Sequence, residues 1–221
     1  PIILISRFKN TEDILIVFLA FLVFGLVASA NYLINDMMDL DSDRRHPTKK
    51  NRPLASGKLS IRNAVIAVVM LLLGAISFIF ILPLIFFGAL AIYLTISILY
   101  SLILKQIEIL DVIVLAVLYT IRIISGALVI KTIPTFWLLA FSMFLFFSLA
   151  LIKRYTELRL IKTSAKEDGY KSSMHGRKYL VEDMVILQIM GLGSGLLAVL
   201  VFALYINSIE IKLLYNYPEI L

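Results

Sequence analysis

Long runs of apolar residues alternate with short polar segments along the whole chain. Each run comes close to the ~20 apolar residues that a helix needs to cross a bilayer. The pattern predicts about six transmembrane helices, at residues 13–34, 63–81, 84–104, 110–130, 135–152 and 184–206. We therefore expect an all-α fold, a polytopic transmembrane helical bundle.

The composition supports a membrane location. Hydrophobic residues make up 61% of the chain and charged residues only 16%, unlike a soluble domain. Residues 1–221 are expected to form a single integral membrane domain. Because the first residue is Pro1 and the last lies a short way past an apolar run, we expect a natural chain that is longer at both ends. The absence of cysteine excludes disulfide and thiol chemistry.

The basic residues predict which side each loop faces. Residues 44–62 hold seven Lys or Arg and residues 153–178 hold eight. Short loops rich in Lys and Arg remain on the cytoplasmic side. Alternating spans place both segments, together with Lys105, on that side. The opposite side receives Arg7, Lys9, Lys131 and Lys212. Attraction to anionic lipid is an alternative explanation of the net charge of +6.

An aspartate-rich stretch, N-D-M-M-D-L-D-S-D-R-R-H, follows the first apolar run at residues 35–46. At about 100° per residue, Asp36, Asp39 and Asp43 fall within an arc of about 60° on one side of a helix that continues the first span, whereas Asp41 points away. Acidic residues also mark the water boundary of ordinary spans, but charges so close to hydrocarbon are costly without a role. We expect three converging carboxylates.

Converging carboxylates favour a divalent metal site. Unpaired carboxylates repel one another, and a hard cation relieves that repulsion. Mg²⁺ is commonly held by one or two carboxylates together with phosphate oxygens. With a basic loop beside it, the stretch predicts a Mg²⁺–diphosphate site, in which Mn²⁺ could replace Mg²⁺. Asn35 is expected at its rim, and Tyr32, one turn earlier, in a cavity wall.

The stretch N-D-M-M-D-L-D-S-D-R-R-H-P-T-K-K-N-R-P-L-A-S-G-K-L-S resembles the first aspartate-rich motif and following loop of the UbiA superfamily of membrane prenyltransferases. Within it, the sequence is most similar to the decaprenyl-phosphate phosphoribosyltransferase branch. The segment L-D-V-I-V-L-A-V-L-Y-T-I-R-I-I-S-G-A at 110–127, Trp137 and K-R-Y-T-E-L at 153–158 are similar in order and spacing. The resemblance covers most of residues 10–206.

The chain departs from the superfamily pattern in two ways. Prenyltransferases of the superfamily usually carry a second D-x-x-x-D motif on the later inside loop, where this chain has K-R-Y-T-E-L with Glu157 as the only carboxylate. The family also has nine transmembrane helices, so the resemblance implies that one span before this segment and others after it are missing.

The resemblance implies an enzyme, a Mg²⁺-dependent transferase of the prokaryotic plasma membrane. It would move a 5-phosphoribosyl group from phosphoribosyl diphosphate to a polyprenyl, for example decaprenyl, phosphate for cell-wall arabinan precursors. Metal ions and Lys or Arg stabilise a departing diphosphate. The implied metal ligands are Asp36, Asp39 and Asp43. The implied phosphate-binding residues are Lys50, Arg52, Lys153 and Arg154, although each alone could be a solvated loop charge.

Arg122 lies in the middle of a predicted span, with Tyr119 on the same helical side. An intramembrane arginine usually faces a cavity or a partner. Two interpretations stay open: a structural pair with a carboxylate, or binding of the lipid phosphate. His46 and His175 are too far apart in sequence to suggest a metal site or a base.

Two other functions compete with phosphoribosyl transfer. One is a UbiA-type prenyltransferase that moves a polyprenyl chain from its diphosphate to an aromatic acceptor. The other is a transporter, which charged residues within spans also indicate. Carboxylates at a helix end beside a basic loop favour an enzyme. The expected partners are the lipid, the donor and the membrane, without nucleic acid; self-association stays open.

Overall fold

The computed structural model describes residues 11–46, 48–168 and 178–208, and every regular element in these ranges is helical. The long helices are α1 (Thr11–Met38), α3 (Ile61–Ile76), α4 (Leu84–Leu102), α5 (Leu110–Val129), α6 (Phe136–Asp168) and α7 (Met184–Ile206). The predicted all-α membrane bundle is confirmed.

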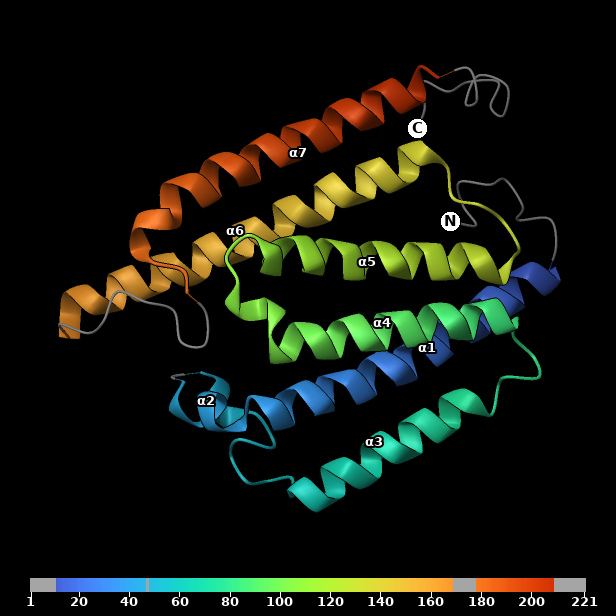
Figure 1. Cartoon of the computed structure of the whole chain (residues 1–221), viewed down its shortest axis with the longest axis horizontal. Helices are drawn as coiled ribbons and strands as arrows, with labels where there is room; N and C mark the ends of the chain where they lie inside the picture. The colour runs from blue at the N-terminus through green and yellow to red at the C-terminus, as the bar shows by residue number, and fades with distance from the viewer. Residues whose placement is uncertain (1–10, 47, 169–177, 209–221) are drawn as a thin grey trace.

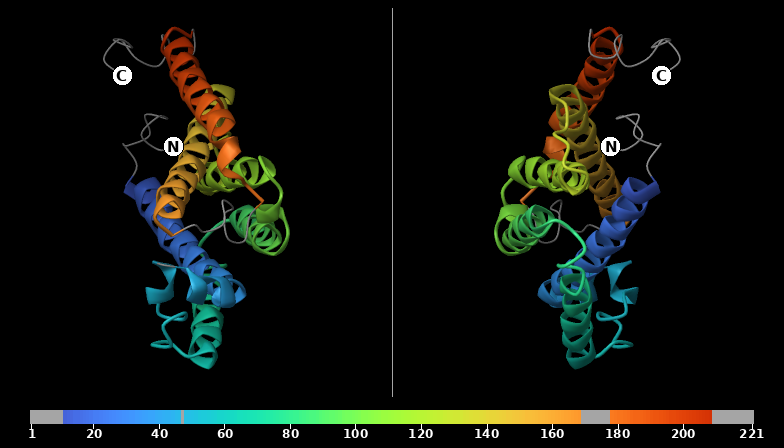
Figure 2. Two further views of the ribbon diagram at one scale, coloured as in Figure 1. Left: turned by 90° about the vertical axis from the view of Figure 1, so that its left-hand side faces the viewer. Right: turned by 90° about the vertical axis from the view of Figure 1, so that its right-hand side faces the viewer.

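The six long helices pack in one elongated bundle (Figure 1). Neighbouring pairs are α7 with α6, α6 with α5, α5 with α4, α4 with α1, and α1 with α3. The side views in Figure 2 show α7 and α3 at opposite edges. Apolar side chains of α1, α4 and α5 form one core, which includes Val23, Phe86 and Leu118, while Leu151 and Leu187 belong to a second core between α6 and α7.

Five helical segments are long and apolar enough to cross a membrane: Glu12–Met38, Leu84–Leu102, Leu110–Val129, Phe136–Thr163 and Val181–Ile206. The sixth predicted span, 63–81, is shorter than expected, because α3 ends at Ile76 and covers about 24 Å. Ser77 Oγ donates to the carbonyl of Gly74 at 2.8 Å, and the chain continues in turns up to Pro83. The described part of the chain therefore holds five long spans and one short apolar helix.

Helix α6 extends far beyond the predicted span at 135–152. It continues to Asp168, so K-R-Y-T-E-L lies on a helix rather than in the expected loop. The extension is rich in Lys, Arg, Leu and Glu, which favour helix, and contains neither Gly nor Pro. Lys153 and Arg154 consequently point in different directions around one helix, whereas Arg154 and Glu157 lie on the same side of it.

Small residues bring α6 and α7 together. Ser148 Oγ donates to the carbonyl of Gly191 at 2.7 Å, and a Cβ atom placed on Gly191 would lie 3.4 Å from Cβ of Leu151. Close approach at small residues and hydrogen bonds across helices are common in membrane proteins. This contact holds α7 against α6.

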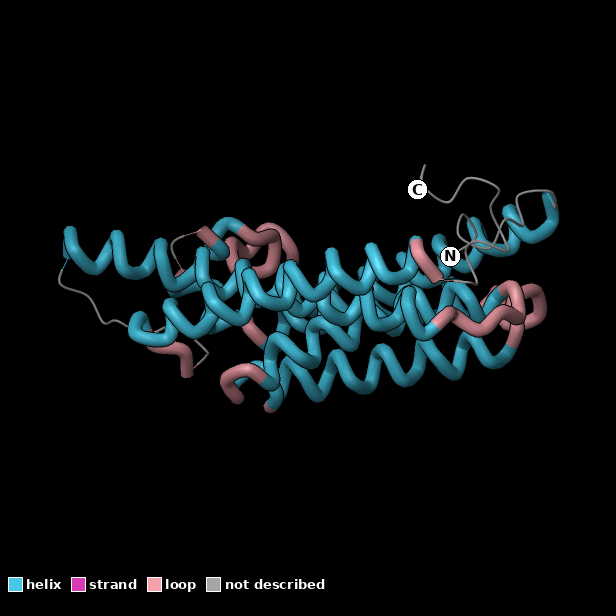
Figure 3. Tube along the Cα trace, turned by 90° about the horizontal axis from the view of Figure 1, so that it is seen from above, coloured by secondary structure: helices cyan, strands magenta, loops and turns pink. Residues whose placement is uncertain are grey.

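The polar connections gather at one end of the bundle. α1 is followed there by α2 (Leu40–Arg45) and the 3₁₀ helix η2 (Lys49–Asn51), on the left of Figure 1. The 3₁₀ helix η3 (Leu104–Gln106) joins α4 to α5 at the same end, and η4 (Val181–Asp183) precedes α7 there. Seen from above, loops lie toward the ends of the helices (Figure 3). Residues far apart in sequence thus meet beside the aspartate motif.

Candidate functional site

The aspartate motif spans a break between two helices. α1 ends at Met38, and Asp39 caps α2 with φ −92° and ψ 6°. The backbone nevertheless keeps the helical pattern, since the amide of Asp39 donates to the carbonyl of Asn35 at 2.9 Å and that of Asp43 to the carbonyl of Asp39 at 2.8 Å. Asp41 is exposed. The expected continuous helix is therefore interrupted at Asp39.

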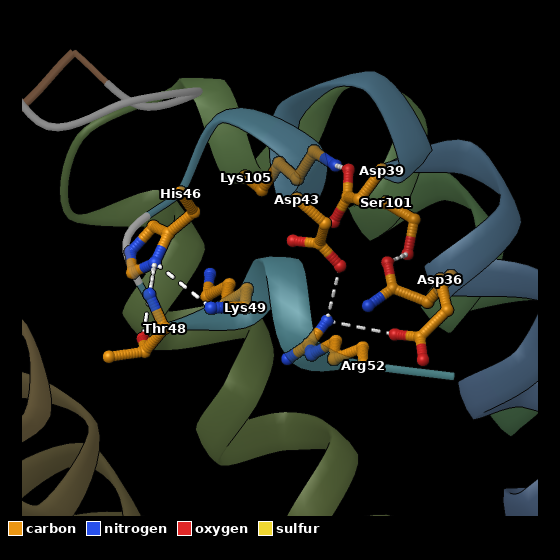
Figure 4. A network of polar contacts seen from close by, with 10 residues as sticks. Asp36, Asp39, Asp43, His46, Thr48, Lys49, Arg52, Ser101 and Lys105 are labelled. Atoms are coloured by element: carbon orange, nitrogen blue, oxygen red, sulfur yellow. Dashed lines mark hydrogen bonds and ion pairs between the residues drawn. The ribbon is translucent and has the colours of Figure 1, made fainter. Parts of the chain in front are cut away.

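Arg52 joins two of the aspartates. Its Nη1 donates to Oδ1 of Asp36 at 2.8 Å and to Oδ2 of Asp43 at 2.7 Å (Figure 4). The loop after α2 folds back to bring Arg52 there: Nδ1 of His46 accepts the amide hydrogens of Thr48 and Lys49, each at 3.3 Å. A single guanidinium nitrogen thus lies between two carboxylates.

Lys105 pairs with the third aspartate, Asp39 (Figure 4). This cation comes from η3, and the sequence analysis did not assign it to the site. It follows the end of α4 in the sequence Y-S-L-I-L-K. The predicted topology places this helix end on the same side of the membrane as the aspartate motif, and this was the signal that the sequence offered. Each of the three motif carboxylates therefore has a cation within the protein.

A ladder of polar pairs aligns α1 with α4. Asn31 Nδ2 donates to Oγ of Ser97 at 2.7 Å, and one turn later Ser101 Oγ donates to Oδ1 of Asn35 at 2.7 Å. The Lys105–Asp39 ion pair continues the series, so all three pairs join residues 66 positions apart. The ladder fixes the register of the two helices and places Asn35 beside the aspartate motif.

The three carboxylates do not form one cluster of metal ligands; no group of three potential ligands occurs within the described ranges. Asp36 and Asp43 nevertheless fit a shared cation, because an oxygen of each already contacts the same positive nitrogen. Carboxylate oxygens are ligands that Mg²⁺ accepts, usually with phosphate oxygens and water completing its shell. These two aspartates could hold the metal, with Asp39 beside them.

Arg154 and Lys153 have different environments. Arg154 is buried: it donates to Oδ2 of Asp111 at 2.6 Å, to Oε2 of Glu157 at 2.8 Å and to the hydroxyl of Tyr100 at 3.2 Å. Lys153 is exposed, as is Lys50, and the structure gives neither side chain an ion pair within the described ranges. Of the four phosphate-binding residues that the resemblance implies, the two lysines are therefore the ones without an ion pair in the described ranges.

Sequence reasoning did not point to Asp111 and Tyr179, which bond to each other beside Arg154. Tyr179 donates its hydroxyl hydrogen to Oδ1 of Asp111 and accepts the amide hydrogen of Ile109 at 2.7 Å. Burial raises the pKa of Tyr179 above its usual range, and the bond to Asp111 raises it further, so the hydroxyl remains a donor. A carboxylate at the start of a predicted span was the available signal for Asp111.

Arg122 lies within the bundle, about 18 Å along α5 from its first residue. Its guanidinium carbon lies 4.8 Å from the ring centre of Tyr119, 5.5 Å from that of Tyr93 and 5.7 Å from that of Phe24. Nη2 donates to the Tyr93 hydroxyl at 3.0 Å, whereas Nε is buried without a hydrogen-bond partner. Through the described ranges, no carboxylate lies within salt-bridge distance.

Tyr32 and Tyr119 flank this arginine. The Tyr32 hydroxyl lies close enough to interact with Arg122, although the side chain is largely exposed. The Tyr119 ring stacks on Phe146 with centroids 4.9 Å apart. Because Tyr32 precedes Asp36 by one helical turn, Arg122 lies on the membrane side of the aspartate motif.

The fold and this polar site define an integral membrane protein whose aspartate-rich helix end is neutralised by cations from two other segments. The chain belongs to the UbiA prenyltransferase family, whose sequence model matches residues 3–214. The resemblance predicted from the motifs is confirmed.

Three relatives illustrate the breadth of the similarity. The nodulation protein NoeC of Azorhizobium caulinodans is 36% identical over 210 residues, which are 94% of this chain and 66% of that protein. An uncharacterised protein of Sinorhizobium fredii is 35% identical over 84% of this chain and 35% of its own length. Decaprenyl-phosphate phosphoribosyltransferase of Mycobacterium tuberculosis is 35% identical over 70% of this chain and 51% of its own length. The chain thus spans about a third to two thirds of these relatives.

Proposed function

We propose that the complete protein transfers a 5-phosphoribosyl group from phosphoribosyl diphosphate to a polyprenyl phosphate in the membrane, with Mg²⁺ or Mn²⁺ at the aspartate motif. The observation that carries this proposal is the shared contact of Asp36 and Asp43 with one cationic nitrogen of Arg52. Such a pair of carboxylates suits a metal ion that also binds a diphosphate. The similarity to decaprenyl-phosphate phosphoribosyltransferases supports this reaction. The product would serve the synthesis of cell-wall arabinan precursors, as the resemblance of the motifs implies.

In this reaction the bond between C1 of the ribose and the diphosphate breaks, and an oxygen of the lipid phosphate bonds to C1. When bound, the metal would neutralise charge on the departing diphosphate. Arg52 and Lys105 already lie at the motif. Lys50, in η2 and two residues before Arg52, is exposed. Cations aimed at the developing charge stabilise the transition state without reorganisation.

Arg122 would bind the phosphate of the lipid. Its charge is surrounded by aromatic rings, and its Nε has an unused hydrogen. A lipid phosphate that enters between the helices could complete its hydrogen bonds. Tyr32, one turn before Asp36 on α1 and close to Arg122, would line the path to the donor.

Residues of the second basic segment, which begins at Lys153, have different roles in this proposal. Lys153 would contact the 5-phosphate of the donor or the lipid phosphate, since its side chain is exposed. Arg154, by contrast, would support the site by holding α6 against α5, and Glu157 would keep the Arg154 side chain in place from within α6. We also propose that the motif faces the cytoplasm, because Lys- and Arg-rich segments gather at its end of the bundle.

Prenyl transfer to an aromatic acceptor is the second candidate, favoured by the family to which the chain belongs. Membranes that contain the complete protein should be incubated with either radiolabelled phosphoribosyl diphosphate or radiolabelled prenyl diphosphate, and their lipids extracted. We expect label from the first donor in a polyprenyl phosphate product, and none with Asp36→Asn. Label only from the second donor, in an aromatic product, would replace the proposal by the prenyltransferase alternative.

A further inference from the structure

The segment before α7 reaches across the bundle to the turn between α4 and α5. Tyr179 is almost fully buried, and its hydroxyl contacts both the amide of Ile109 and the carboxylate of Asp111. These contacts connect residues about 70 positions apart in the sequence. Tyr179 therefore does more than join two helices, because it binds a turn that also supports the aspartate motif.

Ile109 has an unfavourable backbone conformation. Its φ is 63°, in a region that β-branched residues rarely adopt. Such a conformation persists only where the surrounding structure holds it in place. The hydroxyl of Tyr179 supplies a hydrogen-bond acceptor for this amide at 2.7 Å. Without it, the turn would lose a contact that opposes its relaxation.

The same turn carries Lys105. This lysine precedes Ile109 by four residues, and its ammonium pairs with Asp39 of the motif. On the α4 side, the position of Lys105 is set by the bond from Ser101 to Asn35. On the α5 side, Ile109 and Asp111 are held by Tyr179 and Arg154. Relaxation of the turn would displace Lys105 from the motif.

We propose that Tyr179 is a positioning residue for the diphosphate end of the site, acting through the Ile109 turn on Lys105. The inference rests on the proposed function only in that the motif takes a metal-bound diphosphate. Tyr179 lies outside every predicted motif, yet it would affect the affinity for the substrate. The bond to Asp111 orients the hydroxyl so that its oxygen faces Ile109.

A double-mutant cycle tests whether Tyr179 acts through Lys105. The binding of inorganic diphosphate with Mg²⁺ to the purified complete protein would be measured by calorimetry for the unmodified protein, Tyr179→Phe, Lys105→Gln and the double variant. We expect Tyr179→Phe to weaken binding about three- to tenfold alone, the loss of one hydrogen bond, and by less than about twofold in the Lys105→Gln background. Equal factors in both backgrounds would overturn the inference.

Two further variants separate positioning from a general effect on folding. Tyr155→Phe is the matched control, since Tyr155 packs in the same core as Tyr179 but makes no hydrogen bond through its hydroxyl in the described ranges; it should bind diphosphate normally. Ile109→Gly should restore binding to Tyr179→Phe, because glycine accepts positive φ without strain. A loss in Tyr155→Phe as large as that in Tyr179→Phe, or no rescue by glycine, would count against the inference.

The result of the double-mutant cycle can be distinguished from the result of the transfer assay. If the cycle shows coupling but no phosphoribosyl group is transferred, the proposed function fails and the role of Tyr179 stands. If transfer occurs but the two substitutions act independently, only the role of Tyr179 fails. If the unmodified protein does not bind Mg²⁺ diphosphate, both fail.

Discussion

Arg154 and Asp111 form an ion pair that solvent does not reach. Nε of Arg154 lies 2.6 Å from Oδ2 of Asp111, and the two side chains are 1% and 0% exposed. The pair joins α6 to the first turn of α5, and Tyr100 adds a contact from α4. Three helices are therefore held together beside the turn that carries Lys105.

We expect Asp111→Ala to destabilise the protein by about 3–5 kcal/mol, because it leaves the buried charge of Arg154 without its main partner. Arg154→Ala should have a similar effect for the same reason. Lys153→Ala is the matched control: it removes an adjacent but exposed cation, and should change stability by less than about 0.5 kcal/mol. Thermal unfolding of the complete protein in detergent, followed by size-exclusion chromatography, measures the difference. Comparable midpoints for Arg154→Ala and Lys153→Ala would contradict the structural role of Arg154.

The different environments of Lys153 and Arg154 show what the sequence alone could not predict. The apolar runs and the aspartate motif were visible, because length and composition determine whether a helix can cross a bilayer. Lys153 and Arg154 could not be told apart, since adjacent residues on a helix point about 100° apart and only packing shows which one is buried. The sequence pattern also predicted a loop there, whereas the charged continuation of α6 is composed of strong helix formers.

The candidate site was also predictable only in part, because local spacing is visible in the sequence and tertiary packing is not. The spacing of Asp36, Asp39 and Asp43 indicated one helical face, yet the break at Asp39 directs their carboxylates to two different cations. Arg52 was assigned to the site from the motif that contains it. The sequence placed Lys105 on the same side of the membrane as the motif, but its pairing with Asp39 is a tertiary contact between η3 and α1. Tyr179 meets Ile109 and Asp111 across about 70 residues, and no local pattern contains such a contact.

Substitutions in the aspartate motif should separate the carboxylates of the diphosphate site from a surface carboxylate. Asp36→Asn and Asp39→Asn are expected to reduce turnover by about a hundredfold or more, because each weakens stabilisation of charge on the leaving diphosphate. Asp41→Asn should be tolerated, since Asp41 is exposed. Activity should disappear on chelation and return with Mg²⁺ or Mn²⁺. Initial rates with the labelled donor provide the measurement, and equal losses for all three variants would disprove a special role for Asp36 and Asp39.

Arg52→Gln should affect metal and diphosphate binding in opposite directions. Without the guanidinium, Asp36 and Asp43 have no shared cation, so Mn²⁺ alone should bind roughly two- to fivefold more tightly. Diphosphate with Mg²⁺ should bind more weakly, because one phosphate-binding cation is lost. Electron paramagnetic resonance reports free Mn²⁺, and calorimetry reports diphosphate. Lys50→Gln is the control, since its exposed side chain should leave Mn²⁺ binding unchanged; if both variants weaken Mn²⁺ binding, Arg52 does not compete with the metal.

The orientation in the membrane can be tested because the chain contains no cysteine. Single substitutions Lys50→Cys and Lys153→Cys should react with an impermeant thiol reagent only from the cytoplasmic side, where Lys- and Arg-rich segments are retained. Lys131→Cys, in the connection between α5 and α6, should react only from the opposite side. Labelling in intact cells and in inverted membrane vesicles distinguishes the sides. Labelling of positions 50 and 153 from opposite sides would refute the topology.

Arg122→Gln should raise the KM for polyprenyl phosphate about tenfold or more, because a hydrogen-bonded charge is removed from a poorly hydrated part of the bundle. The KM for phosphoribosyl diphosphate should change little, since the arginine lies deeper in the membrane than the aspartates. Lys131→Gln serves as the control, because it removes an exposed cation from the other end of α5. Steady-state rates with each substrate varied in turn, in detergent micelles of constant composition, give the two KM values. An increase confined to the donor KM would place the donor, rather than the lipid phosphate, at Arg122.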